Sequence, residues 1–262
     1  MERSPQVVEL WRFPVKSMQG ERVERLDVGP LGVVGDRAYG VVDEATGLLV
    51  SAKADARLFE AFAWTEDDGA VVVRLPDGSE REARDPSLPA AVSEWLERPV
   101  RIARPGGTAA YDMTLDPPND DAEHYEIPTP VDTFLDLAAL HILTTASLLR
   151  CSTARPDLVW DVRRFRPNVL VEHDGAGFPE DAWVGEQVAL GSDVVAEGLM
   201  RTMRCAMPLR PQPAAPAVGS PVLERSADVF RAMSELHAND LGLYASVVTG
   251  GTIRLGDPVT PR

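Results

Sequence analysis

The sequence predicts a mainly β protein of the α+β class, because short apolar runs and turn signals alternate through most of it. The first third shows this pattern most clearly, with turns at Gly29-Pro30, Asp67-Asp68-Gly69 and Pro76-Asp77-Gly78. That spacing suits a β-barrel or a β-sandwich. The strands predicted between these turns are 7–13, 22–28, 37–43, 48–52 and 71–75.

The rest of the chain mixes helices with further strands. Helices are predicted over 90–96, with Ser87 as N-cap, and over 146–152, opened by Thr144 or Thr145. Apolar residues at helical spacing predict a third helix over 222–238. The five prolines of 208–221 predict an extended loop. Further strands are predicted over 168–172, 188–190, 193–198, 242–248 and 252–255.

A domain boundary is predicted near the middle of the chain. A chain of 262 residues holds one large domain or two small ones. Residues 112–130 carry few core residues, and their Pro117-Pro118-Asn119 run is typical of a loop. We therefore expect two domains, 1–122 and 123–262.

Charge and hydropathy narrow the classes of partner. The formal net charge of −15 argues against a nucleic-acid or anionic-membrane partner, since both bind basic patches. No apolar run approaches the ~20 residues of a membrane span, and the N-terminus has no apolar signal region. A cytoplasmic protein with reduced thiols is expected. Its basic residues are mostly arginine, as in GC-rich bacterial genomes, and only Lys16 and Lys53 are lysines.

Cys205 follows Arg204 just beyond a predicted strand. A thiolate is the ligand and nucleophile form of cysteine, and an adjacent cation lowers its pKa. Soft sulfur also suits a transition metal. A buried, inert thiol is the alternative for Cys205 and the expectation for Cys151, and a bridge between these two cysteines is formally possible.

Two short strings offer anion-binding groups. Lys16 and Ser17 follow a proline-rigidified turn, where a mobile ammonium and a hydroxyl can grip a phosphate. Thr144 and Thr145 stand at the start of a predicted helix, whose free N–H groups attract anions. The alternatives are an ordinary surface pair and plain helix capping.

A third string, Arg164-Phe165-Arg166-Pro167-Asn168, joins a guanidinium to an amide. Pro167 is expected to hold the chain extended, so that Arg166 and Asn168 project to the same side. The guanidinium then offers an anion fork and the amide can read a heterocycle edge. Nearby, Glu180-Asp181-Ala182-Trp183-Val184-Gly185 is assigned to folding, with Trp183 as anchor.

Together with Gly32-Val33-Val34-Gly35-Asp36-Arg37 and the closing Gly251–Val259 run, these strings resemble the MOSC family, named after the C-terminal domain of molybdenum cofactor sulfurase. The likeness extends from about Val7 to Val259. It implies an N-terminal β-barrel domain packed on a MOSC β-barrel domain with a few peripheral helices, and a molybdenum cofactor (Mo-molybdopterin). It also implies that Cys205 is the molybdenum ligand and the catalytic residue. The cofactor-binding residues that it implies are Lys16, Ser17, Arg37, Thr144, Thr145, Arg166, Asn168, Arg204 and Tyr244.

The same resemblance implies an oxidoreductase. The expected reaction is two-electron reduction of N-hydroxylated compounds, such as amidoximes and hydroxylamines, to amines. No cysteine cluster for an iron–sulfur centre is present, so the expected donor is a separate ferredoxin- or cytochrome-type protein with its reductase. Two alternatives remain: a carrier of the cofactor or of sulfur without turnover, and an interaction module without cofactor.

The segment after Cys205 departs from the family pattern. Pro208 and Leu209 replace the threonines that relatives typically carry there. This substitution predicts a drier and stiffer wall facing the substrate.

Overall fold

The computed structural model describes residues 4–112 and 126–262. The expected boundary between residues 122 and 123 lies outside the described residues. No helix in these two ranges is long and apolar enough to cross a membrane.

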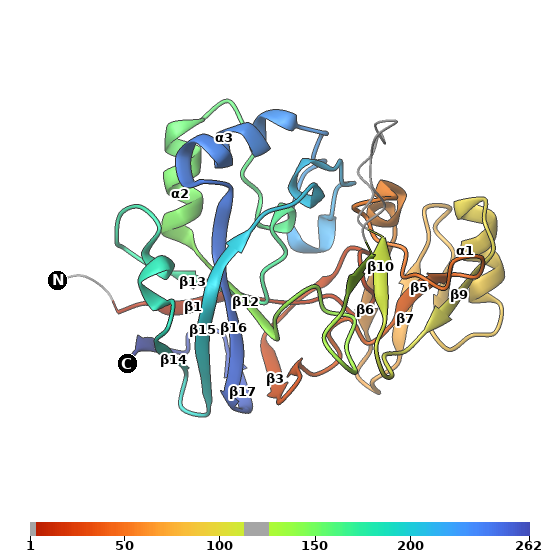
Figure 1. The fold of residues 1–262 in the computed structure, drawn as a ribbon, viewed down its shortest axis with the longest axis horizontal. Helices are drawn as coiled ribbons and strands as arrows, with labels where there is room; N and C mark the ends of the chain where they lie inside the picture. The colour runs from red at the N-terminus through yellow and green to blue at the C-terminus, as the bar shows by residue number, and fades with distance from the viewer. Residues whose placement is uncertain (1–3, 113–125) are drawn as a thin grey trace.

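The fold is mainly β, as predicted, and centres on a curled eight-stranded sheet (Figure 1). The order of its strands along the sheet is β18-β14-β15-β16-β12-β13-β1-β2. The first two strands of the chain therefore close a sheet built mostly from the last 120 or so residues. In chain order its members are β1 (Gln6–Arg12), β2 (Glu21–Val23), β12 (Leu140–Thr144), β13 (Val169–Glu172), β14 (Gln187–Leu190), β15 (Val194–Met203), β16 (Asp240–Thr249) and β18 (Val259–Pro261).

Smaller sheets make up most of the N-terminal half. They are β17 (Gly251–Arg254) with β3 (Arg25–Gly29) and β4 (Gly32–Val33); β5 (Gly40–Asp43) with β9 (Val100–Ala103); β6 (Phe62–Thr65) with β7 (Val71–Arg74) and β8 (Glu80–Glu82); and β10 (Ala110–Asp112) with β11 (Glu126–Pro128). Figure 1 shows these N-terminal strands side by side with the large sheet, and α1 (Leu88–Leu96) at their outer end.

Two further helices, α2 (Thr145–Ala154) and α3 (Ala227–His237), lie together at one end of the large sheet (Figure 1). Between the elements, residues 4–112 and 126–262 form five 3-10 turns. They are η1 (Ala56–Glu60), η2 (Val162–Arg164), η3 (Pro179–Trp183), η4 (Met207–Leu209) and η5 (Pro216–Val218).

Each half of the molecule has its own main apolar core. One lies inside the N-terminal half, around Leu58 and Phe59. The other lies against the large sheet, around Ile142 and Leu243. Met207 belongs to the first core although it follows β15 of the large sheet, and Cys205 packs beside it. The segment after β15 therefore crosses from one half to the other.

Several expected elements differ from the observed ones. Arg37 is in a turn with φ +46° and not in a strand, and β5 begins only at Gly40. The run 48–52 forms isolated bridges at Leu49 rather than a strand. Strand β15 continues to Met203, because its pairing with β16 extends through several bulges. Helix α3 begins at Ala227, since the proline loop continues past residue 222.

Gly198 is required where η3 crosses β15. A Cβ added there would lie 2.0 Å from the carbonyl oxygen of Trp183, whose buried ring anchors this turn. We expect Gly198→Ala to lower the free energy of unfolding by about 1–3 kcal/mol through overpacking. Gly29→Ala is the matched control, because a Cβ there meets no atom within 4 Å. Urea denaturation checks both, and equal stabilities of the two variants would contradict this account.

Candidate functional site

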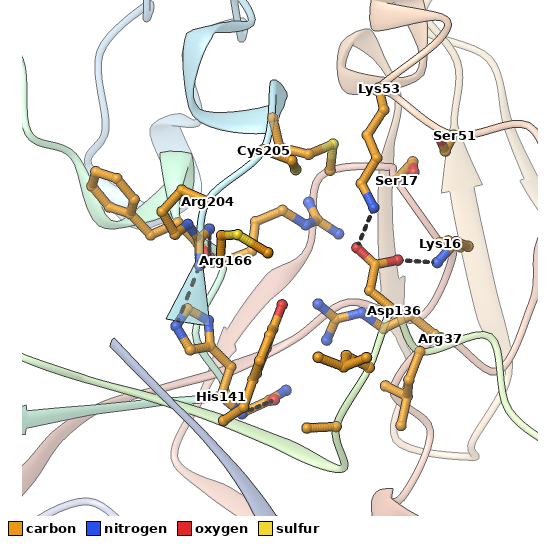
Figure 2. A pocket seen from close by; sticks show the side chains of 18 residues that line it. Lys16, Ser17, Arg37, Ser51, Lys53, Asp136, His141, Arg166, Arg204 and Cys205 are labelled. Carbon is orange, nitrogen blue, oxygen red and sulfur yellow. Dashed lines mark hydrogen bonds and ion pairs between the residues drawn. The ribbon is translucent and has the colours of Figure 1, made fainter. Parts of the chain in front are cut away.

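A pocket open to solvent lies where the two halves meet. Its walls come from the turn after β1, the segment before β12, the turn before β13 and the segment after β15 (Figure 2). The pocket brings together eight of the residues expected from sequence, which are Lys16, Ser17, Arg37, Arg166, Asn168, Arg204, Cys205 and Tyr244.

Three of these residues have unusual backbone conformations. Ser17, Arg37 and Arg166 have φ values of 69°, 46° and 55°, in the left-handed region that non-glycine residues seldom adopt. Arg166 is therefore not extended, contrary to the expectation from Pro167. Such conformations cost of order 1–3 kcal/mol each and persist only where the surrounding structure holds them. Three of the seven non-glycine residues with positive φ in the described chain therefore lie at this pocket.

Two guanidinium groups share the ring of Phe13. The carbon centres of Arg37 and Arg166 lie 4.7 and 4.0 Å from its centroid, within cation–π range. Arg166 is buried and donates from Nη1 to the carbonyl of Met18 at 2.8 Å, but its Nη2 has no partner among the described residues. Burial, and then the charge of Arg37, lowers the pKa of Arg166. An anion in the pocket would satisfy this group.

Asp36 organises this side of the pocket. Its carboxylate pairs with Arg37, accepts from the backbone N–H of Phe13 at 2.7 Å, and accepts from Nδ2 of Asn168 at 3.1 Å. Asn168 in turn accepts from the backbone N–H of His141 at 3.2 Å. The side-chain amide of Asn168 is therefore hydrogen-bonded within the protein, and it links neighbouring strands.

Sequence reasoning missed a charged cluster on the opposite wall. Figure 2 shows the ammonium groups of Lys16 and Lys53 both directed at Asp136, at 2.5 and 2.9 Å. Both ammonium groups also lie over the ring of Tyr111, and Lys16 donates to the carbonyl of Phe134. Lys53 could have been found as the only other lysine of an arginine-rich chain. No motif marked Asp136 or Tyr111.

Burial and charge act in opposite directions on this cluster. Burial lowers the pKa of Lys16 to about 8, despite the nearby carboxylate. In Lys53 burial is the largest single influence and acts to lower the pKa, but Asp136 and other nearby acidic groups together outweigh it and the pKa is raised. Burial would raise the pKa of Asp136, but the two lysines outweigh it and hold that pKa well below its usual range. At neutral pH the three groups therefore carry a net charge of about +1.

Cys205 is held by its neighbours on the segment after β15. Arg204 is buried, donates from Nη2 to the carbonyl of Phe165 at 2.7 Å, and is anchored at its backbone N–H by the carbonyl of Asn239 at 2.9 Å. Its Nε has no partner within 4–112 and 126–262. Cys205 is free and half-buried. Cys151 is also free, so no bridge forms, and burial raises its pKa to about 12.

The structure does not bring Thr144 and Thr145 to the pocket. The hydroxyl groups of Thr144 and Ser147 donate to the buried carboxylate of Glu180 at 2.6 and 2.7 Å. Thr145 accepts from the backbone N–H of His173 at 3.2 Å. The start of α2 is thus capped and already faces a carboxylate, which disfavours a second anion.

Pro208 and Leu209 do not line the pocket either, so the expected drier wall does not come from them. Pro208 is buried in η4, where its carbonyl accepts from Arg164 at 2.8 Å. The apolar lining on this side comes instead from Met203 and Met207.

Comparison with known families agrees with this architecture. The MOSC N-terminal beta barrel domain matches residues 4–98, and the MOSC domain matches residues 131–260. The chain belongs to the MOSC family. It is 26% identical over 294 residues to mitochondrial amidoxime reducing component 2 of Homo sapiens, covering 97% of this chain and 82% of that protein. The protein of the same name from Rattus norvegicus is 25% identical over 300 residues, with the same coverage. The YUAD protein structure from Bacillus subtilis aligns with a TM-score of 0.47 and 12% identity, covering 99% of this chain and 96% of that one.

The residues of this MOSC protein fit the cofactor after which the family is named. That cofactor combines a soft metal site with an anionic phosphate. Cys205 offers a sulfur donor, and the Arg166 and Arg204 nitrogens that have no partner among the described residues offer buried donors for anionic oxygens.

Asp136→Asn tests the electrostatics of the charged cluster. The substitution leaves the ammonium groups of Lys16 and Lys53 facing each other without a counter-charge. We expect the free energy of unfolding to fall by about 1–3 kcal/mol, less than for a fully buried pair because the Asp136 side chain is 35% exposed. Added sulfate should restore stability more in the variant than in the parent protein. Thermal unfolding with and without sulfate measures this, and an unchanged midpoint in Asp136→Asn would refute it.

Proposed function

We propose that this MOSC protein is a molybdenum-cofactor-dependent reductase that converts N-hydroxylated compounds, such as amidoximes and hydroxylamines, to amines. The observation that carries the proposal is that one pocket joins the Cys205 thiol to buried arginine nitrogens that lack partners among the described residues. The names of its mammalian relatives support an amidoxime as the substrate class.

Each wall has a distinct part in binding. Cys205 would ligate the metal through sulfur, and Arg166 with Arg37 would hold the phosphate. Asp36 and Asn168 would act indirectly, by holding Arg37 and the adjoining strands in place. When bound, the cofactor supplies a metal that changes its oxidation state by two electrons.

The overall conversion of R–NHOH to R–NH2 and water consumes two electrons and two protons. The pocket opens to solvent, which can deliver the protons. His141 lines the pocket as a neutral imidazole, because burial and then the charge of Arg204 lower its pKa well below the usual value. It therefore adds no further positive charge beside Arg204. We propose that the electrons come from a separate electron-transfer protein, as the word "component" in the relatives' name suggests.

Loss of the thiol should remove the metal. We expect Cys205→Ala, purified from a molybdenum-supplied host, to contain less than a tenth of the molybdenum of the parent protein and no benzamidoxime reductase activity with a chemical electron donor. Cys151→Ala is the matched control, since that thiol is buried away from the pocket.

Metal analysis and turnover assays separate the possible outcomes. Molybdenum near one equivalent in Cys205→Ala would show that the thiol is not the ligand. A parent protein that holds the metal but never turns over any N-hydroxylated compound would instead be a carrier.

Anion binding should depend on the charge of Lys16. Its ammonium form attracts anions, and its pKa is about 8, so affinity is retained below pH 8 and lost above it. We expect the dissociation constant of sulfate, which does not titrate in this range, to rise up to tenfold per pH unit above pH 8. Lys16→Arg keeps its charge and should flatten the profile. Calorimetric titration between pH 7 and 9.5 measures it; a profile of the same slope in both proteins would exclude Lys16.

A further inference from the structure

We infer that the mouth of this pocket is an apolar rim that binds a flat apolar group next to the reacting nitrogen, with Met203 as the side chain that selects it. The inference rests on the proposed reductase function and names the substrate class for it.

Two exposed apolar side chains carry the inference. Most exposed large apolar residues of the described chain lie away from the pocket, but Leu137 and Met203 line it. Leu137 is 55% exposed and Met203 is 73% exposed. An apolar side chain standing in water at a pocket mouth gains free energy when a ligand covers it, by about 25 cal/mol per Å².

The rim lies directly beside the chemistry. Met203 precedes Cys205 by two residues at the end of β15, and Leu137 follows Asp136. The side chain of Thr202 is fully buried, so the alternation of the strand directs Met203 to the opposite side. The two rim residues thus come from separate walls, one next to the thiol and one next to the charged cluster.

The depth of the pocket and its mouth differ in chemistry. The depth is charged, with Lys16, Lys53, Asp136 and Arg166. The two most exposed residues that line the pocket, Leu137 and Met203, are apolar. A ligand that matches both has a polar N–O end directed inward and an apolar body outward. A flexible methionine adapts to flat bodies of different outline, which favours a class of substrates over one compound.

The test compares two amidoximes on molybdenum-loaded protein. Benzamidoxime carries a flat apolar ring, and acetamidoxime carries only a methyl group. We expect the parent protein to prefer benzamidoxime in kcat/KM. In Met203→Ser the KM for benzamidoxime should rise about fivefold to twentyfold with kcat little changed, because binding common to ground and transition states is lost. The KM for acetamidoxime should change less than about twofold.

Two further variants complete the design. Met203→Leu keeps the apolar surface and should retain the preference. Met200→Ser is the matched control, since Met200 is an exposed methionine of the same strand outside the pocket lining. Molybdenum content and thermal midpoint should be unchanged in all three.

The outcomes separate the two proposals. Equal changes for both amidoximes in Met203→Ser, or the same change in Met200→Ser, would overturn the rim inference and leave the reductase intact. A loaded parent protein that reduces neither amidoxime would overturn the proposed function, and the rim inference with it.

Discussion

Buried positive charge without a matching anion is the constraint on which the rest of this site depends. Arg166 and Arg204 are almost fully buried, and Arg37 lies beside the first of them. The protein offsets part of this charge with the carboxylate of Asp36 and with backbone carbonyls, but two guanidinium nitrogens stay without partners in the described part of the chain. A buried donor left unpaired costs about 1–3 kcal/mol. An anionic ligand that accepts from these nitrogens would remove that cost.

The sheet topology explains how residues far apart in sequence meet there. Strand β1 pairs antiparallel with β13, with Leu10 opposite Val169. The turn that follows β1 and the turn that precedes β13 therefore lie at the same end of the sheet. Strand β15 pairs with β16 along its length, so the segment that follows it places Cys205 at the same end of the sheet. In these turns, residues with left-handed backbone conformations direct their side chains into the pocket. In a regular strand the same side chains would point away from it. Site and fold are therefore specified by the same pairings.

The sequence predicted the part of the site that lies in contiguous strings, because a string such as Arg166-Pro167-Asn168 is visible without any knowledge of the fold. It did not predict Asp136, a single acid in an irregular segment whose role arises only from two lysines distant in the chain. It misplaced Thr144, since a helix start looks free until Glu180, 36 residues later, is seen to occupy it. Sequence reasoning also placed Pro208 in the wall of the pocket, where Met203 and Met207 lie instead. In each case the deciding contact is long-range.

Folding of this protein and binding of an anion in its pocket would depend on the same electrostatic free energy. Without an anion, the folded state bears the cost of desolvated arginines and of strained backbone at Ser17, Arg37 and Arg166. An anion that binds only the folded state removes the electrostatic part of that cost and adds stability in proportion to its affinity. The net charge of −15 repels anions from the protein as a whole, whereas the positive charge of the pocket attracts them. Under the proposed function, a ligand with a phosphate and a thiophilic metal would engage Arg166 and Cys205 together.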